Sequence, residues 1–296
     1  MKKVMFWNLR GIGTSKKRLR KLVRVHQPCV LFLAEPFGDD SQLSYWCDYF
    51  SFSACISNAD KAGKLWCFWV AGIQVDVVGG SDQYLALMIN SNILISTVYA
   101  KCWYLDRRVL WEDLLNVNAV QMPHVILGDF NILRNDSERR GGGPRLLMAM
   151  EEFSSIIDAG GLVEMPFIGN KFSWGNGQSG MARSWAHLDR AMCNLKFLEV
   201  FPMVHNQYLP RRSSDHSPML LSLSAALSRV LSSPVVIHED ACVYFEEFLK
   251  ATQSSSLPNL DDLILGEVSI GQTELPHLLK GIIRTDACGL PQIRKC

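Results

Sequence analysis

The first 35 residues contain two apolar runs with an amphipathic segment between them. Val4–Trp7 and Cys29–Ala34 have the length of buried strands, and a polar residue follows each. Between them, apolar residues recur at three- and four-residue spacing, which predicts a helix capped by Ser15 and stopped by Pro28. A strand, a helix and a second strand in this order predict the start of an α/β domain.

The rest of the body has the pattern of a sheet-rich domain with two further helices. Runs of strand length, separated mainly by Gly, Ser, Asp and Asn, predict these strands: Lys64–Ala71, Ile73–Val78, Tyr84–Asn90, Ile93–Ala100, His124–Gly128, Lys171–Trp174, Ser184–Cys193 and His216–Leu223. Helical spacing predicts helices over Asp106–Val117 and around residues 146–159, with Val109 and Met148 on their apolar faces. The body is therefore predicted to be mixed α/β, with more strands than helices.

After about Leu227 the composition of the chain changes. Ser-rich segments at residues 222–233 and 254–256 flank stretches that are only weakly amphipathic. We therefore predict one domain over residues 1–226, followed by a Ser-rich, weakly helical C-terminal tail of uncertain order over residues 227–296.

Composition and net charge exclude few classes of function, but the basic residues are distributed unevenly along the chain. With 296 residues, 48% hydrophobic and 20% charged, the chain has the composition of a globular protein with a large core. The net charge is only +1, yet residues 1–30 carry nine Lys or Arg and no Asp or Glu. A basic N-terminal patch suits a phosphate backbone as partner, although a solvated helix face explains it equally well.

The cysteines and the N-terminus indicate an intracellular protein. Nine cysteines are scattered along the chain, without a C-x-x-C pair or a Cys/His zinc spacing, so buried free thiols such as Cys67 are expected. The apolar start breaks at Asn8 and is too short for a signal peptide, and no run of about 18 apolar residues occurs. We expect the nucleus or cytoplasm, no secretion, no membrane contact and no stable protein partner.

Polar side chains capable of phosphate chemistry cluster where predicted strands end or begin. These are Asn8, Glu35, Tyr99, Asp129, Asn131, Asp189, Asp215 and His216. Each alone has an ordinary structural explanation, such as a turn or a half-buried strand position. Together they match a catalytic site, because functional side chains gather where the core fixes strand ends.

These residue types suit a metal-assisted reaction at a phosphate. Glu35 with Asp215 or Asp129 supplies the hard oxygen ligands that Mg²⁺ prefers. The amides, the phenol and the imidazole supply donors, and Asp189 could hold the ring of His216 in position. Acyl transfer by a Ser/His/Asp set is the weaker alternative, because no G-x-S-x-G elbow occurs. No P-loop occurs either, so Gly141–Gly143 is read as a loop.

Six motifs in order resemble the endonuclease/exonuclease/phosphatase superfamily, whose fold is that of DNase I. They span about residues 3–224: Trp7-Asn8-Leu9-Arg10-Gly11, Leu33-Ala34-Glu35-Pro36, Val98-Tyr99-Ala100, Gly128-Asp129-Phe130-Asn131, His187-Leu188-Asp189-Arg190 and Ser214-Asp215-His216-Ser217-Pro218. Three further motifs resemble the endonuclease domain of plant non-LTR (LINE-type) retrotransposons: Glu138-Arg139-Arg140-Gly141-Gly142, Phe172-Ser173-Trp174-Gly175-Asn176 and Leu188-Asp189-Arg190-Ala191. The polymerase signature Tyr-x-Asp-Asp of the following reverse transcriptase does not occur in the 296 residues.

The resemblance implies a four-layered α/β sandwich, in which two packed mixed β-sheets are flanked by helices. It implies a Mg²⁺-dependent phosphodiester hydrolase, with Mn²⁺ as an alternative metal, that nicks DNA and derives from a LINE-type element. Glu35 would bind the metal, with Asn8 and Asp215 beside it. Asp129 would orient or deprotonate the attacking water.

The remaining roles that the resemblance implies concern the phosphate groups. Asn131, Tyr99 and His216 would contact the scissile phosphate, with Asp189 steadying His216. The DNA backbone would meet a set of basic residues: Lys16, Lys17, Arg20, Arg139 and Arg140.

Some features of the chain depart from the resemblance or leave alternatives open. Arg10 stands where the related repair nucleases carry an acidic residue, His187 stands where this branch usually has Arg, and Gly63-Lys64 replaces a usual glycine pair. A phosphomonoesterase or lipid phosphoesterase of the same fold, and a catalytically silent retroelement relic, remain the alternatives. For the Gly128–Asn131 turn, we expect Asp129 and Asn131 to project to one side, with Phe130 in the packing between them.

Overall fold

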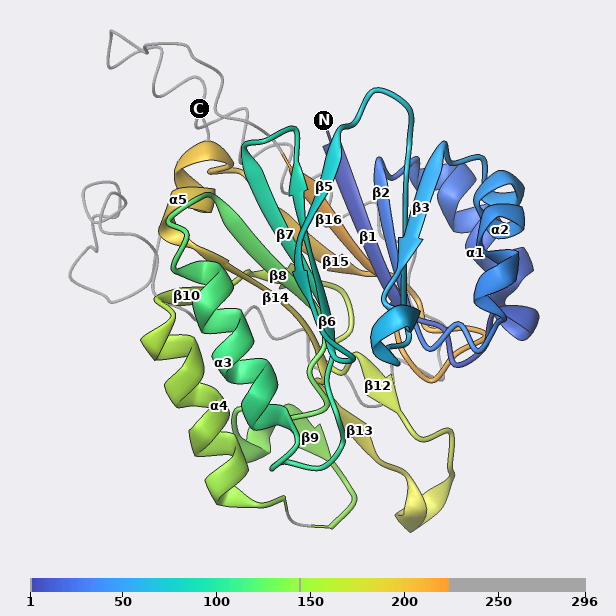
Figure 1. Ribbon diagram of the computed structural model, residues 1–296. Coiled ribbons are helices and arrows are strands. Elements are labelled where there is room, and N and C mark those ends of the chain that lie inside the picture. The colour runs from blue at the N-terminus through green and yellow to red at the C-terminus, as the bar shows by residue number, and fades with distance from the viewer. Residues whose placement is uncertain (1, 144, 224–296) are drawn as a thin grey trace, which may run out of the picture.

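Residues 2–143 and 145–223 are described by a computed structural model, in which two mixed β-sheets pack face to face. Figure 1 shows helices α1 (Ile12–His26) and α2 (Leu43–Phe50) on the outer side of one sheet. Helices α3 (Arg107–Asn118) and α4 (Leu147–Ala159) lie on the outer side of the other sheet. The four predicted layers are therefore confirmed.

The first sheet has seven strands and the second has six. In spatial order the first comprises β11 (Phe167–Ile168), β15 (His205–Tyr208), β16 (Met219–Leu223), β1 (Lys2–Asn8), β2 (Val30–Ala34), β4 (Leu65–Trp69) and β3 (Ala54–Ser57). The second comprises β10 (Leu162–Glu164), β14 (Asp189–Asn194), β8 (His124–Asp129), β7 (Ile93–Tyr99), β6 (Tyr84–Ile89) and β5 (Val75–Gly80). Each is mixed, because β1 is parallel to β2 and β7 is parallel to β8, with antiparallel neighbours on either side.

Shorter elements complete the fold at the ends of the sandwich. They are a small sheet of β12 (Trp174–Gly175), β13 (Trp185–Ala186) and β9 (Arg139–Arg140), the helix α5 (Leu195–Val200), and the 3₁₀ turns η1 (Asp40–Gln42), η2 (Ala59–Lys61), η3 (Asp136–Glu138) and η4 (Gly180–Ala182). Figure 1 places the small sheet at the end of the sandwich where β1 and β8 finish.

Three apolar cores separate the four layers, and single strands contribute to two of them. In β1, Val4 and Phe6 pack between the sheets, whereas Met5 and Trp7 pack against α1 and α2. This division follows from the two-residue period of a strand, which sends neighbouring side chains to opposite faces. Burial on both faces explains why the central strands read as unbroken apolar runs. It also fixes their last residues rigidly, so polar side chains placed there are held in position.

The predicted helices are found, but some of their details are wrong. Helix α1 starts at Ile12, and Ser15 does not cap it. Ser15 is buried in the first turns and donates to the carbonyls of Leu9 and Ser213 at 3.3 and 2.8 Å. Val109 and Met148 are exposed, at 61% and 57%, because the buried stripes of α3 and α4 run along other positions of these helices.

Two predicted strands are shorter than expected, and one is divided. Only Trp174 of the segment Lys171–Trp174 lies in a strand, and Ser184–Cys193 contains both β13 and β14. The last strand starts at Met219. The elements that the sequence pattern missed are short ones: α2, β3, β9, β10, β11, β15, α5 and the four 3₁₀ turns of the described residues.

Two of the predictions concern the C-terminal residues. The predicted boundary at residue 226 and the tail over residues 227–296 lie outside the described residues. Within the described residues, no helix combines the length and the apolar character needed to cross a membrane.

Candidate active site

Asn8 connects the ends of the two sheets. It is the last residue of β1 and is fully buried. Its side-chain nitrogen donates to Oδ2 of Asp129, at the end of β8, at 3.0 Å, and approaches Oε1 of Glu35 at 3.4 Å. The amide of Asn8 therefore orients two carboxylates from different sheets, and the structure brings Asn8 and Glu35 together.

Glu35 follows β2 in a strained backbone conformation. Its φ angle is 46°, in the left-handed region that non-glycine residues rarely adopt. Backbone hydrogen bonds hold it there, from Glu35 N to the Lys64 carbonyl at 3.0 Å and from Gly11 N to the Glu35 carbonyl at 2.9 Å. The hydroxyl of Tyr99 donates to Oε1 of Glu35. Burial, with this bonded carboxylate, raises the pKa of Tyr99 well above its ordinary value, so Tyr99 remains a donor at neutral pH.

The turn after β8 differs from the extended geometry that was expected. Asn131 has a φ angle of 50°, its backbone N–H donates to Oδ1 of Asp129 at 3.0 Å, and its side chain donates to the Ala100 carbonyl at 2.8 Å. The chain therefore bends at Asn131, and the strand geometry through Phe130 on which the expected common direction of Asp129 and Asn131 depended does not persist. Phe130 is fully buried as expected.

A buried group consists of Asp129, Asp189 and His216, in which the imidazole ring lies between the two carboxylates. Nδ1 of His216 is 2.9 and 3.1 Å from the oxygens of Asp189, and Nε2 is 3.7 Å from Oδ2 of Asp129. Burial alone lowers the pKa of His216, but Asp189 and then Asp129 outweigh it and raise the pKa to about 9. At neutral pH the ring is therefore an imidazolium. Asp189 steadies it as predicted.

Hydrogen bonds from the neighbouring strands fix this group. The indole of Trp7 donates to the His216 carbonyl at 3.0 Å, and Ser173 Oγ accepts from the backbone N–H of Asp189 at 2.9 Å. Asp189 is paired with Asp129 in the register of β14 and β8. The ring and its partner are therefore set by backbone positions in both sheets.

Asp215 lies at the outer side of the cluster with two partners that the sequence did not indicate. Its Oδ2 accepts from Nη1 of Arg10 and from the indole N–H of Trp174, each at 3.0 Å. Nε of Arg10 is also 3.7 Å from Oε2 of Glu35. Arg10 was noted only as a departure from related nucleases, and Trp174 only as part of a motif, so neither contact was expected.

Both sheets thus place acidic, amide, phenol and imidazole groups at one end of the sandwich. A sequence profile of the Endonuclease/Exonuclease/phosphatase family matches residues 5–216, which include all of these side chains. The chain belongs to this family. It is accordingly a member of a family of phosphoesterases, and the buried Asp/Asp/His group is consistent with metal-dependent hydrolysis. No curated protein matches the chain significantly.

Solved structures of other proteins share the fold. The endonuclease domain of TRAS1, a telomere-specific non-LTR retrotransposon, has a TM-score of 0.58 at 13% identity over 76% of this chain and 100% of that one. The 3′ phosphatase NExo from Neisseria, bound to a product DNA hairpin, has 0.55 at 15% identity over 76% and 100%. The 3′-5′ exonuclease NExo from Neisseria meningitidis has 0.57 at 16% identity over 75% and 99%. At these identities the likeness shows the fold, a DNase I-like α/β sandwich.

The site of this family member carries more acidic than basic groups. Its charged side chains are Glu35, Asp129, Asp189, Asp215, Arg10 and His216. Burial raises the pKa of Asp129 to about 7, because a charged carboxylate loses its hydration there. The four acidic groups outnumber the two basic ones. They offer oxygen ligands to a divalent cation, which would offset their excess negative charge. The residues present therefore fit a bound metal ion.

The buried group and the outer carboxylates differ in their suitability for a metal. Ligand atoms of Asp129, Asp189 and His216 lie within 4.8 Å of one another, close enough for a shared ion. A protonated imidazole has no free lone pair, however, so His216 in its ion-paired state is a donor instead of a ligand. The side chains of Glu35 and Asp215 are 12% and 23% exposed and offer oxygens near solvent, as a partly hydrated cation requires.

The predicted DNA-contacting residues lie in two separate places. Lys16, Lys17 and Arg20 are exposed along α1, where the guanidinium of Arg20 stacks 4.8 Å from the ring centre of Tyr49. Of these residues, Lys17 and Arg20 line a hollow of about 620 Å³ together with Lys21 and Arg24. This basic surface is continuous along the helix, as the charge pattern indicated.

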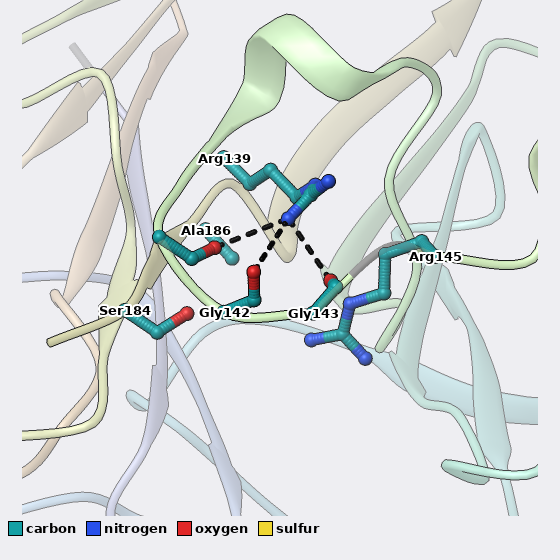
Figure 2. Close-up of a pocket in the computed structure, with 7 residues that line it drawn as sticks. Arg139, Gly142, Gly143, Arg145, Ser184 and Ala186 are labelled. Atoms are coloured by element: carbon teal, nitrogen blue, oxygen red, sulfur yellow. Dashed lines mark hydrogen bonds between the residues drawn. The ribbon is translucent and has the colours of Figure 1, made fainter. Parts of the chain in front are cut away.

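Arg139 and Arg140 lie on β9 in the small sheet. Nε of Arg139 donates to Asp136 at 2.8 Å, and Nη1 donates to the carbonyls of Gly141, Gly142 and Gly143 at 2.9 to 3.2 Å. Figure 2 shows the three bonds to the glycine carbonyls, beside a hollow of about 290 Å³ that Arg145 also lines. Arg139 thus organises its own glycine loop, whereas Arg140 is exposed on the strand.

Proposed function

We propose that the protein is a Mg²⁺-dependent phosphodiester hydrolase that nicks DNA. The single observation that carries the proposal is the convergence of Asn8, Glu35, Asp129 and the Asp189–His216 pair from both sheets at one end of the sandwich. The proposed metal ligands are Glu35 and Asp215, with Asn8 beside Glu35 and orienting it. The bound cation would neutralise charge that develops on the phosphate, and Mn²⁺ would serve in the same role.

Asp129 is proposed to take the proton of the attacking water. Asn8 donates to its Oδ2 and the Asn131 backbone to its Oδ1, so the carboxylate is held in one orientation. Its raised pKa makes it a better proton acceptor near neutral pH than an ordinary aspartate. A positioned base of this kind contributes roughly 10²- to 10⁴-fold to a rate.

The donors of the site are proposed to bind the scissile phosphate. The imidazolium of His216 carries a positive charge that Asp189 holds in place, which suits it to stabilise the additional negative charge of the transition state. Tyr99 orients Glu35 through its hydroxyl. The amide of Asn131 is anchored by the Ala100 carbonyl at the same end of the sheet.

DNA is the proposed partner, through its phosphate backbone. Lys16, Lys17 and Arg20 form the exposed basic surface on α1, and Arg140 adds charge on β9, with Arg139 shaping that loop. The neighbour TRAS1 is a retrotransposon endonuclease and a NExo structure contains a DNA hairpin, which supports a nucleic acid as substrate. The origin in a plant LINE-type element and the location in nucleus or cytoplasm stay predictions from the sequence.

A plasmid assay tests the proposal. Purified protein is incubated with supercoiled plasmid and Mg²⁺, with EDTA as a control, and the Asp129→Asn variant is compared with wild type. We expect EDTA-sensitive conversion to open circles and a loss of at least about 100-fold in the variant. Asp158→Asn is the matched control, because Asp158 is an exposed residue of α4 outside the cluster.

Other outcomes point to the alternatives. An oligonucleotide with a 3′ phosphate and a phospholipid are assayed in parallel, because NExo is described as both a 3′ phosphatase and an exonuclease. Release of phosphate from either substrate without plasmid nicking would replace the endonuclease by a phosphomonoesterase or lipid phosphoesterase. A folded protein without any of these activities would be a silent relic.

A further inference from the structure

Arg10 places a positive charge between the two outer carboxylates of the site. Its Nη1 donates to Oδ2 of Asp215 at 3.0 Å, and its Nε lies 3.7 Å from Oε2 of Glu35. The two acidic residues are 180 positions apart in the chain, and the guanidinium contacts both. The side chain of Arg10 is 55% exposed, so this charge stands at the mouth of the site.

The backbone holds Arg10 in this place by a strained turn. Its φ angle is 47°, and its N–H donates to Oδ1 of Asn8 at 3.2 Å. The next residue, Gly11, donates to the Glu35 carbonyl at 2.9 Å. Such a conformation persists only where surrounding bonds impose it, and here those bonds come from two residues of the site itself. The position of Arg10 is therefore a built feature of the cluster.

We propose that Arg10 is an internal cation of the active site that competes with the divalent metal ion for Glu35 and Asp215. The inference rests on the proposed function, because it assumes that these carboxylates bind the metal. A guanidinium is always charged and presents five N–H donors, so it offsets part of the negative charge of the two carboxylates when no metal is bound. A metal ion on the same two carboxylates would lie close to this guanidinium, and the repulsion between the two cations weakens metal binding.

Calorimetric titration of Mn²⁺ into EDTA-treated, dialysed protein tests this without any measurement of activity. Arg10→Met keeps the aliphatic stem and removes the charge, and we expect it to bind Mn²⁺ about tenfold more tightly than wild type. Arg10→Lys keeps the charge and is expected to bind with nearly the wild-type affinity. Arg108→Met is the matched control, because Arg108 is 52% exposed and pairs with Glu152 far from the cluster along the chain.

The outcomes separate this inference from the proposed function. Equal or weaker Mn²⁺ binding in Arg10→Met would overturn the inference, as would an equal gain in Arg108→Met. A tenfold gain confined to Arg10→Met, in a protein that does not nick plasmid, would support the competition and contradict the endonuclease. Absence of Mn²⁺ binding in both wild type and Arg10→Met would contradict both.

Discussion

At the scale of single residues, Gly128 shows how closely β8 packs against β7. Its φ angle is 154°, and a Cβ placed there would lie 2.0 Å from the carbonyl oxygen of Val98 on the neighbouring strand β7. That neighbour is backbone within a parallel ladder, so it cannot move aside without breaking the register that pairs Tyr99 with Asp129. Only glycine therefore allows Asp129 to end this strand.

Gly128→Ala and Gly13→Ala are expected to have opposite effects on stability. Gly128→Ala should lower the free energy of unfolding by about 2–4 kcal/mol, from overpacking and backbone strain together. Gly13 lies on the exposed side of α1 with open space around it, so Gly13→Ala should raise that energy by roughly 0.5–1 kcal/mol. Denaturant unfolding measures both, and a Gly128→Ala protein as stable as wild type would contradict the packing described.

Asp189 controls the charge of His216, and its removal is expected to lower the pKa of the ring. In wild type Asp189 is the main group that offsets burial and raises this pKa to about 9. In Asp189→Asn the burial remains and only Asp129 and, more weakly, Asp215 oppose it, so the pKa should fall. An NMR pH titration of His216 in the presence of EDTA measures the shift. An unchanged pKa in Asp189→Asn would show that another group holds the proton, and Asp158→Asn should leave it unchanged.

At the scale of elements, buried ion pairs link β14 to the loop that carries η3 and β9. The guanidinium of Arg190 is fully buried and pairs with Glu138, and with Glu164 of β10 at 2.7 Å. Arg190 follows Asp189, so on a strand the two side chains point to opposite faces. Arg190 lies over the ring of Phe153 of α4 at 5.7 Å, while Asp189 faces the site. The retroelement-like motif at Glu138 therefore has a structural role.

Arg190→Met is expected to destabilise the protein strongly. It leaves Glu138 and Glu164 partly buried without their cation, which typically lowers the free energy of unfolding by about 3–5 kcal/mol. The comparison is Arg108→Met, whose surface pair with Glu152 should contribute less than about 1 kcal/mol. Denaturant unfolding of the two variants measures the difference. Similar losses of unfolding free energy in both variants would contradict a special stabilising role of the buried ion pairs.

At the scale of the whole molecule, acid is expected to destabilise the fold through buried neutral histidines. His124 opens β8, fully buried between Ser96 and Asn118, and burial lowers its pKa to about 4. In the unfolded chain its pKa is about 6.5, so between these values the unfolded state binds more protons and stability falls as the pH is lowered.

The size of this effect follows from the two pKa values. Between pH 7.5 and pH 5, His124 alone should lower the free energy of unfolding by about 2 kcal/mol. Urea unfolding at both pH values measures it, with His124→Gln as the variant that lacks this part of the pH dependence. An equal pH dependence in wild type and His124→Gln would contradict the assignment.

Much of the molecule follows from local pattern alone. The unbroken apolar runs before Asn8, Glu35 and Asp129 predicted central strands, because strands buried on both faces have no polar positions until they end. The same argument placed the polar ends together, and the structure joins Asn8 with Asp129 and Asp189 with His216. Short elements such as β10 and β15 escaped, because a few residues carry too little periodicity to be read.

Tertiary structure alone decided how the charges at the site are paired. Arg10 with Asp215, and Asp215 with Trp174, are contacts over 205 and 41 positions of the chain. No repeat or spacing encodes such a contact, because it depends on how β1, the small sheet and the loop before β16 meet in space. The bend at Asn131 was likewise not expected, although asparagine adopts a left-handed backbone more readily than most residues, and the hydrogen bond to Asp129 fixes it. The sequence by itself determined which strands are buried and where they end. Packing decided which cation each acid faces, because Arg10 lies beside Glu35 and Asp215 whereas His216 lies beside Asp129 and Asp189.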